Sequence, residues 1–260
     1  MFNLYSNPWF HIKKPMPNAK MRLFCFPYAG GSAQIYVDWH EYLPDSVEVV
    51  ALQYPGRGSR FADPLIGTCK EMVDSIIPEM LPALNKPFAL FGHSNGGMVS
   101  FELARELYKR GVTNQLHHFL SAKRAIHLPP VRKPMHNLPF DEFIEQIVDL
   151  GGTPPEILAQ KELMELFVPI LRSDFSLGET FSYQDTHKLH CDATLLYGSE
   201  DNDVPKEDVL AWQQLIEKPV DTHEFEGGHF FINSGKEKVL ELVNHKLVQI
   251  LAQIPGSMLD

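Results

Sequence analysis

Cysteine is scarce in this chain, which has three cysteines among 260 residues. Cys25, Cys69 and Cys191 are too few and too far apart for a disulfide framework, and no two of them form a C-x-x-C pair. There is also no H-x-x-x-H segment. We therefore expect neither a stabilising disulfide network nor a metal centre.

Long hydrophobic runs and a surplus of positive charge are also lacking. The longest apolar runs, at residues 23–26 and 88–91, are far too short to cross a bilayer. The first 15 residues lack the basic start and apolar stretch of a signal peptide. The net charge of −10 would repel nucleic acid and anionic membranes. We expect a cytoplasmic protein that binds neither.

What the chain does contain is a regular alternation of short apolar segments with segments of helical periodicity. This order predicts a mostly parallel, twisted sheet with helices on both faces, that is, an α/β fold. The expected strands are residues 21–27, 47–53, 88–91, 116–121, 193–197 and 222–225. The expected helices are residues 68–84, interrupted by Pro78 and Pro82, and then 98–110, 206–217 and 236–251.

One stretch, from about residue 125 to 184, breaks this alternation because it shows helical periodicity and no convincing strand. An inserted pair of helices can cover a site as a lid, or it can pack on the sheet as an ordinary crossover. We expect a lid, with movable joints at residues 151–152 and 154–155. It would be an insertion within a single domain spanning residues 1–260.

The sequence GHSNG at residues 92–96 follows an expected strand and precedes an expected helix. A G-x-S-x-G motif in this setting places a nucleophilic serine on a strained turn, where small neighbours let the strand and the helix approach closely. The pattern is typical of the α/β-hydrolase fold and makes Ser94 the expected nucleophile. The N–H of Asn95 would then face a developing oxyanion.

A serine nucleophile needs a base and an orienting carboxylate, which this fold supplies in the chain order Ser, Asp or Glu, His. His229 lies late in the chain, in a loop between glycines and aromatic residues. For the acid, Asp201 directly follows an expected strand, whereas Asp203 is better placed to cap the next helix and Glu200 is a third candidate. Of the other histidines, we expect His93, His117 and His118 to pack rather than react.

A second oxyanion donor is expected in the glycine-rich loop at residues 28–32, which follows the first expected strand. This loop lacks the Lys-Ser/Thr ending of a phosphate-binding P-loop, so nucleotide binding is not expected.

With these residues identified, the sequence resembles the type II thioesterases, the free-standing editing enzymes of nonribosomal peptide and polyketide synthesis. The resemblance rests on five motifs: FPYAGGS at residues 26–32, YPGRG at 54–58, GHSNGG at 92–97, LRSDF at 171–175 with Glu179, and GGHFF at 227–231. The family usually has methionine after the nucleophile, where this chain has Asn95. An amide there is expected to make the floor of the acyl pocket more polar.

The resemblance implies a triad of Ser94, Asp201 and His229, with the backbone N–H groups of Ala29 and Asn95 as oxyanion donors. It implies hydrolysis of acyl thioesters on the phosphopantetheine arm of a carrier protein by a monomer without cofactor or metal. A small-molecule esterase or lipase of the same fold, or a noncatalytic binding protein, would be the alternatives. Because carrier proteins are acidic, we expect them to dock on a local basic cluster made of Lys123, Arg124, Arg132 and Lys133.

Overall fold

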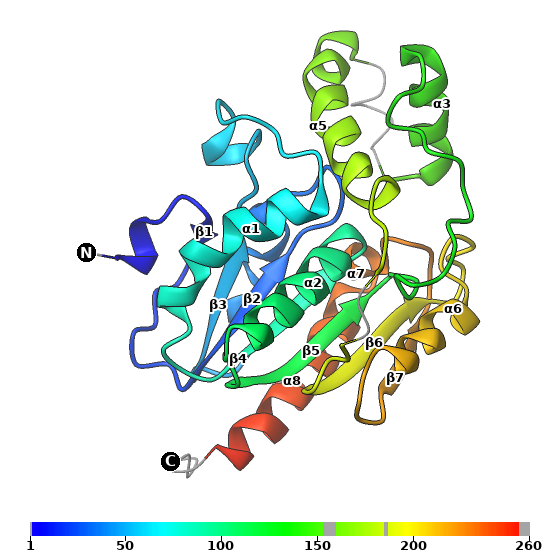
Figure 1. The fold of residues 1–260 in the computed structure, drawn as a ribbon. Coiled ribbons are helices and arrows are strands. Elements are labelled where there is room, and N and C mark those ends of the chain that lie inside the picture. Colours follow the sequence, from blue (N-terminus) through cyan, green and yellow to red (C-terminus); the bar gives the residue numbers. More distant parts are fainter. Residues whose placement is uncertain (1, 153–159, 185–186, 255–260) are drawn as a thin grey trace.

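A seven-stranded sheet forms the centre of the molecule (Figure 1). The computed structural model describes residues 2–152, 160–184 and 187–254. The strand order is β1-β3-β2-β4-β5-β6-β7, and all neighbouring strands run parallel except β1, which pairs with β3 in the antiparallel sense. The strands are β1 Phe10–His11, β2 Met21–Phe26, β3 Val47–Leu52, β4 Phe88–His93, β5 Gln115–Ser121, β6 Asp192–Gly198 and β7 Asp221–Phe225. The predicted α/β fold is confirmed.

Helices cover both faces of this sheet, with α1 and α2 on one face and α8 on the other (Figure 1). The α-helices are α1 Cys69–Met80, α2 Asn95–Lys109, α3 Phe140–Leu150, α5 Lys161–Glu179, α6 Lys206–Leu210, α7 Phe231–Ser234 and α8 Lys236–Gln253. Short 3₁₀ turns are η1 Leu4–Ser6, η2 Ala33–Tyr36, η3 Trp39–Glu41, η4 Gly58–Arg60, η5 Leu81–Ala83 and η6 Ala211–Gln214.

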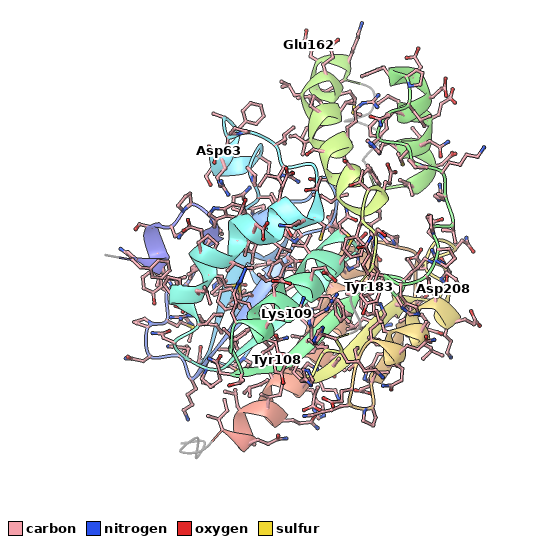
Figure 2. The ribbon with its side chains drawn as sticks, in the orientation of Figure 1. Asp63, Tyr108, Lys109, Glu162, Tyr183 and Asp208 are labelled. Atoms are coloured by element: carbon pink, nitrogen blue, oxygen red, sulfur yellow. The ribbon has the colours of Figure 1, made fainter. Side chains whose placement is uncertain are left out.

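Charged residues such as Lys109 and Glu162 lie on the outside of the molecule (Figure 2). None of the described helices combines the length and the hydrophobicity needed to cross a membrane.

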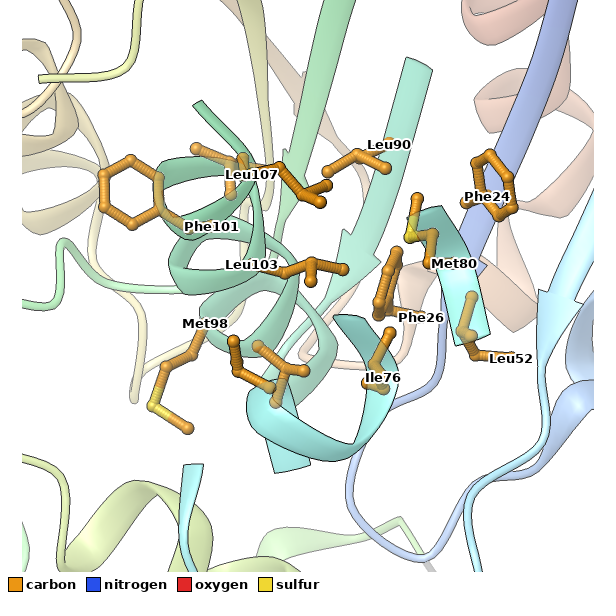
Figure 3. Packing of buried hydrophobic residues seen from close by; sticks show 14 of the residues in the cluster. Phe24, Phe26, Leu52, Ile76, Met80, Leu90, Met98, Phe101, Leu103 and Leu107 are labelled. Atoms are coloured by element: carbon orange, nitrogen blue, oxygen red, sulfur yellow. The ribbon is translucent and has the colours of Figure 1, made fainter. Parts of the chain in front are cut away.

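Two apolar cores, one on each face, hold the helices against the sheet. The strands β2, β3 and β4 are buried along their whole length, as strands covered on both faces must be. Phe24, Phe26 and Leu90 of the sheet meet Ile76 of α1 and Leu103 of α2 in the first core (Figure 3). In the second core, α8 packs its apolar stripe against the opposite face. The sheet is thereby a rigid platform for the loops at its carboxyl edge.

The helices α3 and α5 stand away from the sheet and share a small core of their own (Figure 1). Met135, Phe143 and Ile147 pack there against Met164 and Val168, and Leu171 completes the cluster. These are the helical patterns expected of a lid, and within the described residues of 125–184 no strand interrupts them. Residues 154–155, expected as one of its joints, lie outside the described residues.

Several elements differ from the sequence-based expectation, and three of them illustrate why. The helix α2 starts at Asn95 and not at residue 98. Gly96 and Gly97 are poor helix formers, which is why the sequence predicted a later start, but tertiary packing outweighs their low propensity here. The expected helix at 206–217 divides into α6 and η6. The strand β1 was not predicted because it comprises two residues, too few for any periodicity.

Candidate active site

Ser94 occupies a strained turn between β4 and α2. Its backbone has φ +55° and ψ −119°, a conformation that residues other than glycine rarely adopt. A Cβ atom on Gly92 would lie 2.3 Å from the carbonyl oxygen of Gly96, and one on Gly96 would lie 2.1 Å from that of Phe26. Both positions therefore exclude any side chain, which is the physical reason for the glycines of the motif.

Three side chains from different loops form a hydrogen-bonded row at this turn. The Nε2 atom of His229 lies 2.9 Å from the Oγ atom of Ser94, and its Nδ1 atom lies 2.6 Å from Oδ2 of Asp201. The Asp201 side chain is 2% exposed, whereas that of His229 is 23% exposed. An Nδ1–H donated to the carboxylate leaves Nε2 as an acceptor that faces the serine hydroxyl. This arrangement can activate a hydroxyl nucleophile.

The other two acidic candidates for this row make different contacts. Glu200 is exposed. Asp203 forms a two-pronged ion pair with Arg132, whose Nε and Nη2 atoms each lie 2.8 Å from one of its carboxylate oxygens. The expectation that Asp203 caps α6 is wrong, since Pro205 is the N-cap and no side chain caps that helix terminus.

His93, next to the nucleophile, is buried as expected, but it also contacts the loop that carries His229. Its Nε2 atom lies 2.9 Å from the carbonyl oxygen of His229, and its Nδ1 atom lies 2.9 Å from Oγ of Ser121. A carbonyl can only accept, so Nε2 donates and Nδ1 accepts from the Ser121 hydroxyl. Burial holds the pKa of His93 well below its ordinary value, which keeps the ring in this neutral form.

The two expected oxyanion donors, the backbone N–H groups of Ala29 and Asn95, have no hydrogen-bond acceptor among the residues the structure describes. Asn95 is the first residue of α2, where an N–H group has no partner within the helix. Ala29 lines the same small cavity as Ser94 and His229. Both donors are thus available to a ligand atom at the turn.

That cavity has a volume of about 80 Å³ and lies between the hydrogen-bonded row and the helices α3 and α5. Its wall is largely apolar and consists of Tyr28, Ala29, Ser94, Ile147, Leu150, Gly152, Leu171, Phe175, His229 and Phe230. Asn95 does not belong to this wall, because its side-chain Nδ2 atom donates to the carbonyl oxygen of Asp174 at 2.6 Å. The expected polar pocket floor is therefore wrong.

Two of the four residues in the basic cluster expected to dock a carrier protein are engaged in ion pairs. Lys123 is half-buried, and burial lowers its pKa to about 8. Arg124 pairs with Asp208, which lies on α6 at the outer edge of the molecule (Figure 2), and Arg132 pairs with Asp203. Of the four residues, Lys133 is exposed and has no ion pair within the described part of the chain. These contacts join residues 70 or more positions apart, which the sequence did not reveal.

We searched residues 2–152, 160–184 and 187–254 for side chains that could together bind a metal ion. No group of three or more histidine, cysteine, aspartate or glutamate side chains gathers there in a way that could hold an ion. Two other buried histidines form hydrogen bonds with hydroxyl groups: Nε2 of His117 with Oγ1 of Thr194, and Nε2 of His118 with Oγ of Ser100. Their burial lowers the pKa of His117 to about 4 and that of His118 to about 3, so both are neutral packing residues, as expected.

Comparisons with known proteins agree on one family. The thioesterase domain family matches residues 21–247. The gramicidin S biosynthesis protein GrsT of Aneurinibacillus migulanus is 34% identical over 246 residues, covering 95% of this chain and 96% of the relative.

Among solved structures, ClbQ from the colibactin NRPS/PKS pathway has a TM-score of 0.84 at 33% identity, covering 89% of this chain and 98% of that one. The type II thioesterase BorB from the borrelidin biosynthetic cluster has the same TM-score at 30% identity, covering 94% and 99% of the two chains.

Proposed function

Since the chain belongs to the thioesterase family and is an enzyme that hydrolyses thioesters, we propose that Ser94, His229 and Asp201 are its catalytic triad. The observation that carries this proposal is the hydrogen-bonded row that ends on Ser94 Oγ at a strained turn. Asp201 would hold His229 in the tautomer whose Nε2 accepts a proton, and it would stabilise the imidazolium that forms.

The reaction proceeds in two displacements. Ser94 Oγ attacks the thioester carbonyl carbon while His229 Nε2 takes the hydroxyl proton, and the N–H groups of Ala29 and Asn95 stabilise the oxyanion. The carbon–sulfur bond then breaks, the thiol leaves with the proton held by His229, and the acyl group stays on Ser94 as an ester. Water, deprotonated by His229, hydrolyses this ester and releases the carboxylic acid. The chemistry needs neither a metal ion nor a cofactor.

The substrate we propose is an acyl, aminoacyl or peptidyl group on the phosphopantetheine arm of a carrier protein. The support is the similarity to proteins of gramicidin S, colibactin and borrelidin biosynthesis over nearly their whole length. Residues from about 125 to 184 would act as a lid within a single domain, because α3 and α5 line the cavity at Ser94. We propose that this enzyme acts in the cytoplasm, alongside its synthase.

The first experiment tests the nucleophile. Ser94→Ala should abolish labelling by a fluorophosphonate and nearly all thioester hydrolysis while the protein stays folded. Loss of a triad member leaves about 10³–10⁴-fold acceleration over water. A folded Ser94→Ala protein with wild-type turnover would contradict the triad.

A substrate comparison with the wild-type enzyme separates thioesterase from esterase. We expect an acyl group on a carrier protein to be hydrolysed with a higher kcat/KM than the oxygen ester of the same acyl group. Equal or better turnover of the oxygen ester would identify a small-molecule esterase of this fold.

A further inference from the structure

The two residues that follow Ala29 are held by side chains from other parts of the chain. The N–H of Gly30 donates to Oδ2 of Asp174 at 2.6 Å. The carbonyl of Gly31 accepts from Nη1 of Arg57 at 3.2 Å. Asp174 lies on the lid helix α5, and Arg57 follows β3 in the YPGRG segment. The loop that presents the Ala29 N–H is therefore fixed at the next peptide by a residue of the lid.

Asp174 and Arg57 also bind each other in a two-pronged ion pair. The Nη1 and Nη2 atoms of Arg57 lie 2.5 and 2.7 Å from the two oxygens of Asp174. The side chains are 7% and 2% exposed, so water screens this pair little. Oδ2 of Asp174 accepts from both Arg57 Nη1 and the N–H of Gly30. The carboxylate position is thus set from two sides.

Packing places the same loop directly on α5. Gly30 has φ +77°, and a Cβ atom there would lie 2.7 Å from Cδ2 of Leu171. Leu171 precedes Asp174 by three residues, so both project from one face of α5. The left-handed φ favours glycine at residue 30, and without a side chain there the backbone of the loop lies directly against Leu171 of α5.

The second proposed oxyanion donor reaches the same residue. Asn95 Nδ2 donates to the main-chain carbonyl of Asp174 at 2.6 Å, and the Asn95 side chain is buried. Gly178, one turn further along α5, also approaches Asn95 closely: a Cβ atom there would lie 3.3 Å from its Oδ1. One residue of α5 therefore contacts both segments whose N–H groups face Ser94, through its carboxylate on one side and its carbonyl on the other.

We propose that Asp174 is a positioning residue for the oxyanion hole, which it sets by joining the loop after Ala29 to the first residue of α2. This inference rests on the proposed function, in which Ala29 and Asn95 donate to the oxyanion. Such donors act only when they lie within about 2.7–3.1 Å of the oxyanion, so a small shift of either loop weakens transition-state binding. The C-terminal half of α5 is then part of the catalytic framework and not a freely moving cover.

The test is Asp174→Asn in the full-length enzyme. The amide keeps the shape of the side chain, and its oxygen can still accept from the N–H of Gly30. It has only one acceptor oxygen, however, so it cannot accept from both Nη1 and Nη2 of Arg57 as the carboxylate does. We expect kcat to fall by about 10- to 100-fold, less than the roughly 10²–10³-fold loss that follows removal of an oxyanion donor. The KM should stay within threefold. A trifluoromethyl ketone, which forms an oxyanion on the serine, should lose affinity by the same factor as kcat/KM.

A buried ion pair at the other end of the strands provides a matched control. Glu48 binds Arg22 Nε at 2.7 Å, and these side chains are 0% and 7% exposed. Glu48→Gln should lower thermal stability as Asp174→Asn does, yet leave kcat and inhibitor affinity unchanged. If Asp174→Asn does not fold, Asn95→Ala, which removes one hydrogen bond to the Asp174 carbonyl, should reduce kcat/KM and inhibitor affinity in equal proportion.

Three results would overturn the inference: a kcat of folded Asp174→Asn within twofold of wild type, a kcat loss without loss of inhibitor affinity, or an equal kcat loss in Glu48→Gln. Failure of the proposed function looks different, because Ser94→Ala would then retain thioesterase activity. An inactive Ser94→Ala beside a fully active Asp174→Asn would reject the positioning role alone.

Discussion

Asp201 and Asp203 stand two residues apart on one loop, and their partners give them different roles. Asp201 contacts the imidazole of His229, whereas Asp203 contacts Arg132 at an exposed site. We expect Asp201→Asn to lower kcat by about 10⁴-fold, because the histidine tautomer is no longer held. Asp203→Asn should change kcat less than about threefold, since an exposed ion pair contributes at most about 1 kcal/mol.

Steady-state hydrolysis of one thioester by both variants is the measurement, with circular dichroism to establish that each is folded. A large defect confined to Asp203→Asn would make Asp203 the triad acid.

Single residues were predictable where a local pattern defines their role. Ser94 could be proposed from its glycine neighbours and His229 from its loop and its place late in the chain, and the structure brings the two side chains to 2.9 Å. The choice among acids, the bond from His93 to the His229 carbonyl and the pairing of Arg57 with Asp174 depend on contacts between distant segments. Arg57 and Asp174 are 117 positions apart, and nothing near either residue identifies its partner.

At the scale of elements, α5 joins two regions that are held by different contacts. Its N-terminal part packs in the lid core through Met164 and Val168, whereas its C-terminal part bonds the main body. Ser173 Oγ donates to the Ile66 carbonyl at 2.9 Å, and Ser176 Oγ donates to the Gly67 carbonyl at 2.8 Å. We expect α3 and the first half of α5 to exchange amide hydrogens faster than β4, and the segment from Ser173 onward to exchange nearly as slowly as the sheet.

Hydrogen exchange read by mass spectrometry resolves these segments. Slow exchange along all of α3 and α5, equal to that of β4, would support the crossover interpretation in place of a lid.

Elements of ordinary length were predicted to within a few residues because each carries its own signal. The helix expected from residue 68, for example, does begin there: Thr68 is the N-cap of α1, and its hydroxyl accepts from the N–H of Glu71 at 3.2 Å. Pro78 and Pro82 were both expected to interrupt the helix. Pro78 lies within α1, so no break occurs there, whereas α1 does end at Met80 before the 3₁₀ turn that contains Pro82. What failed were cases in which packing outweighs propensity, such as the glycine-rich start of α2, or in which an element is too short to show a period, such as β1.

For the molecule as a whole, buried neutral histidines predict sensitivity to acid. Burial lowers the pKa of His117 to about 4 and of His118 to about 3, against 6.5 for an unperturbed histidine. Between these values the unfolded chain binds protons that the folded protein does not. The contribution of these two histidines to the free energy of unfolding is therefore fully present above pH 6.5. It is lost as the pH falls, at up to about 1.4 kcal/mol per pH unit for each histidine.

Urea unfolding at several pH values between 4.5 and 7 measures this slope. His118→Gln should make it shallower, whereas His245→Gln, at an exposed position on α8, should leave it unchanged. Equal slopes in all three proteins would show that His118 does not govern the acid response.

The separate core of the lid has a consequence for how such an enzyme can change its substrate. The cavity is lined by Ile147 and Leu150 of α3 and by Leu171 and Phe175 of α5, all of which belong to the cluster shared by these two helices or pack against it. This cluster is distinct from the two cores of the sheet, and only further along α5 does Leu177 join the main core. Substitutions of Ile147 and Leu150 on α3 can therefore reshape the cavity without altering the contacts of Leu171 and Asp174 with the loop after Ala29. For protein engineering, α3 and the part of α5 before Asp174 are the segment of the proposed lid to exchange. A replacement from another enzyme should rejoin this chain before Asp174, so that the ion pair of Asp174 with Arg57 is kept.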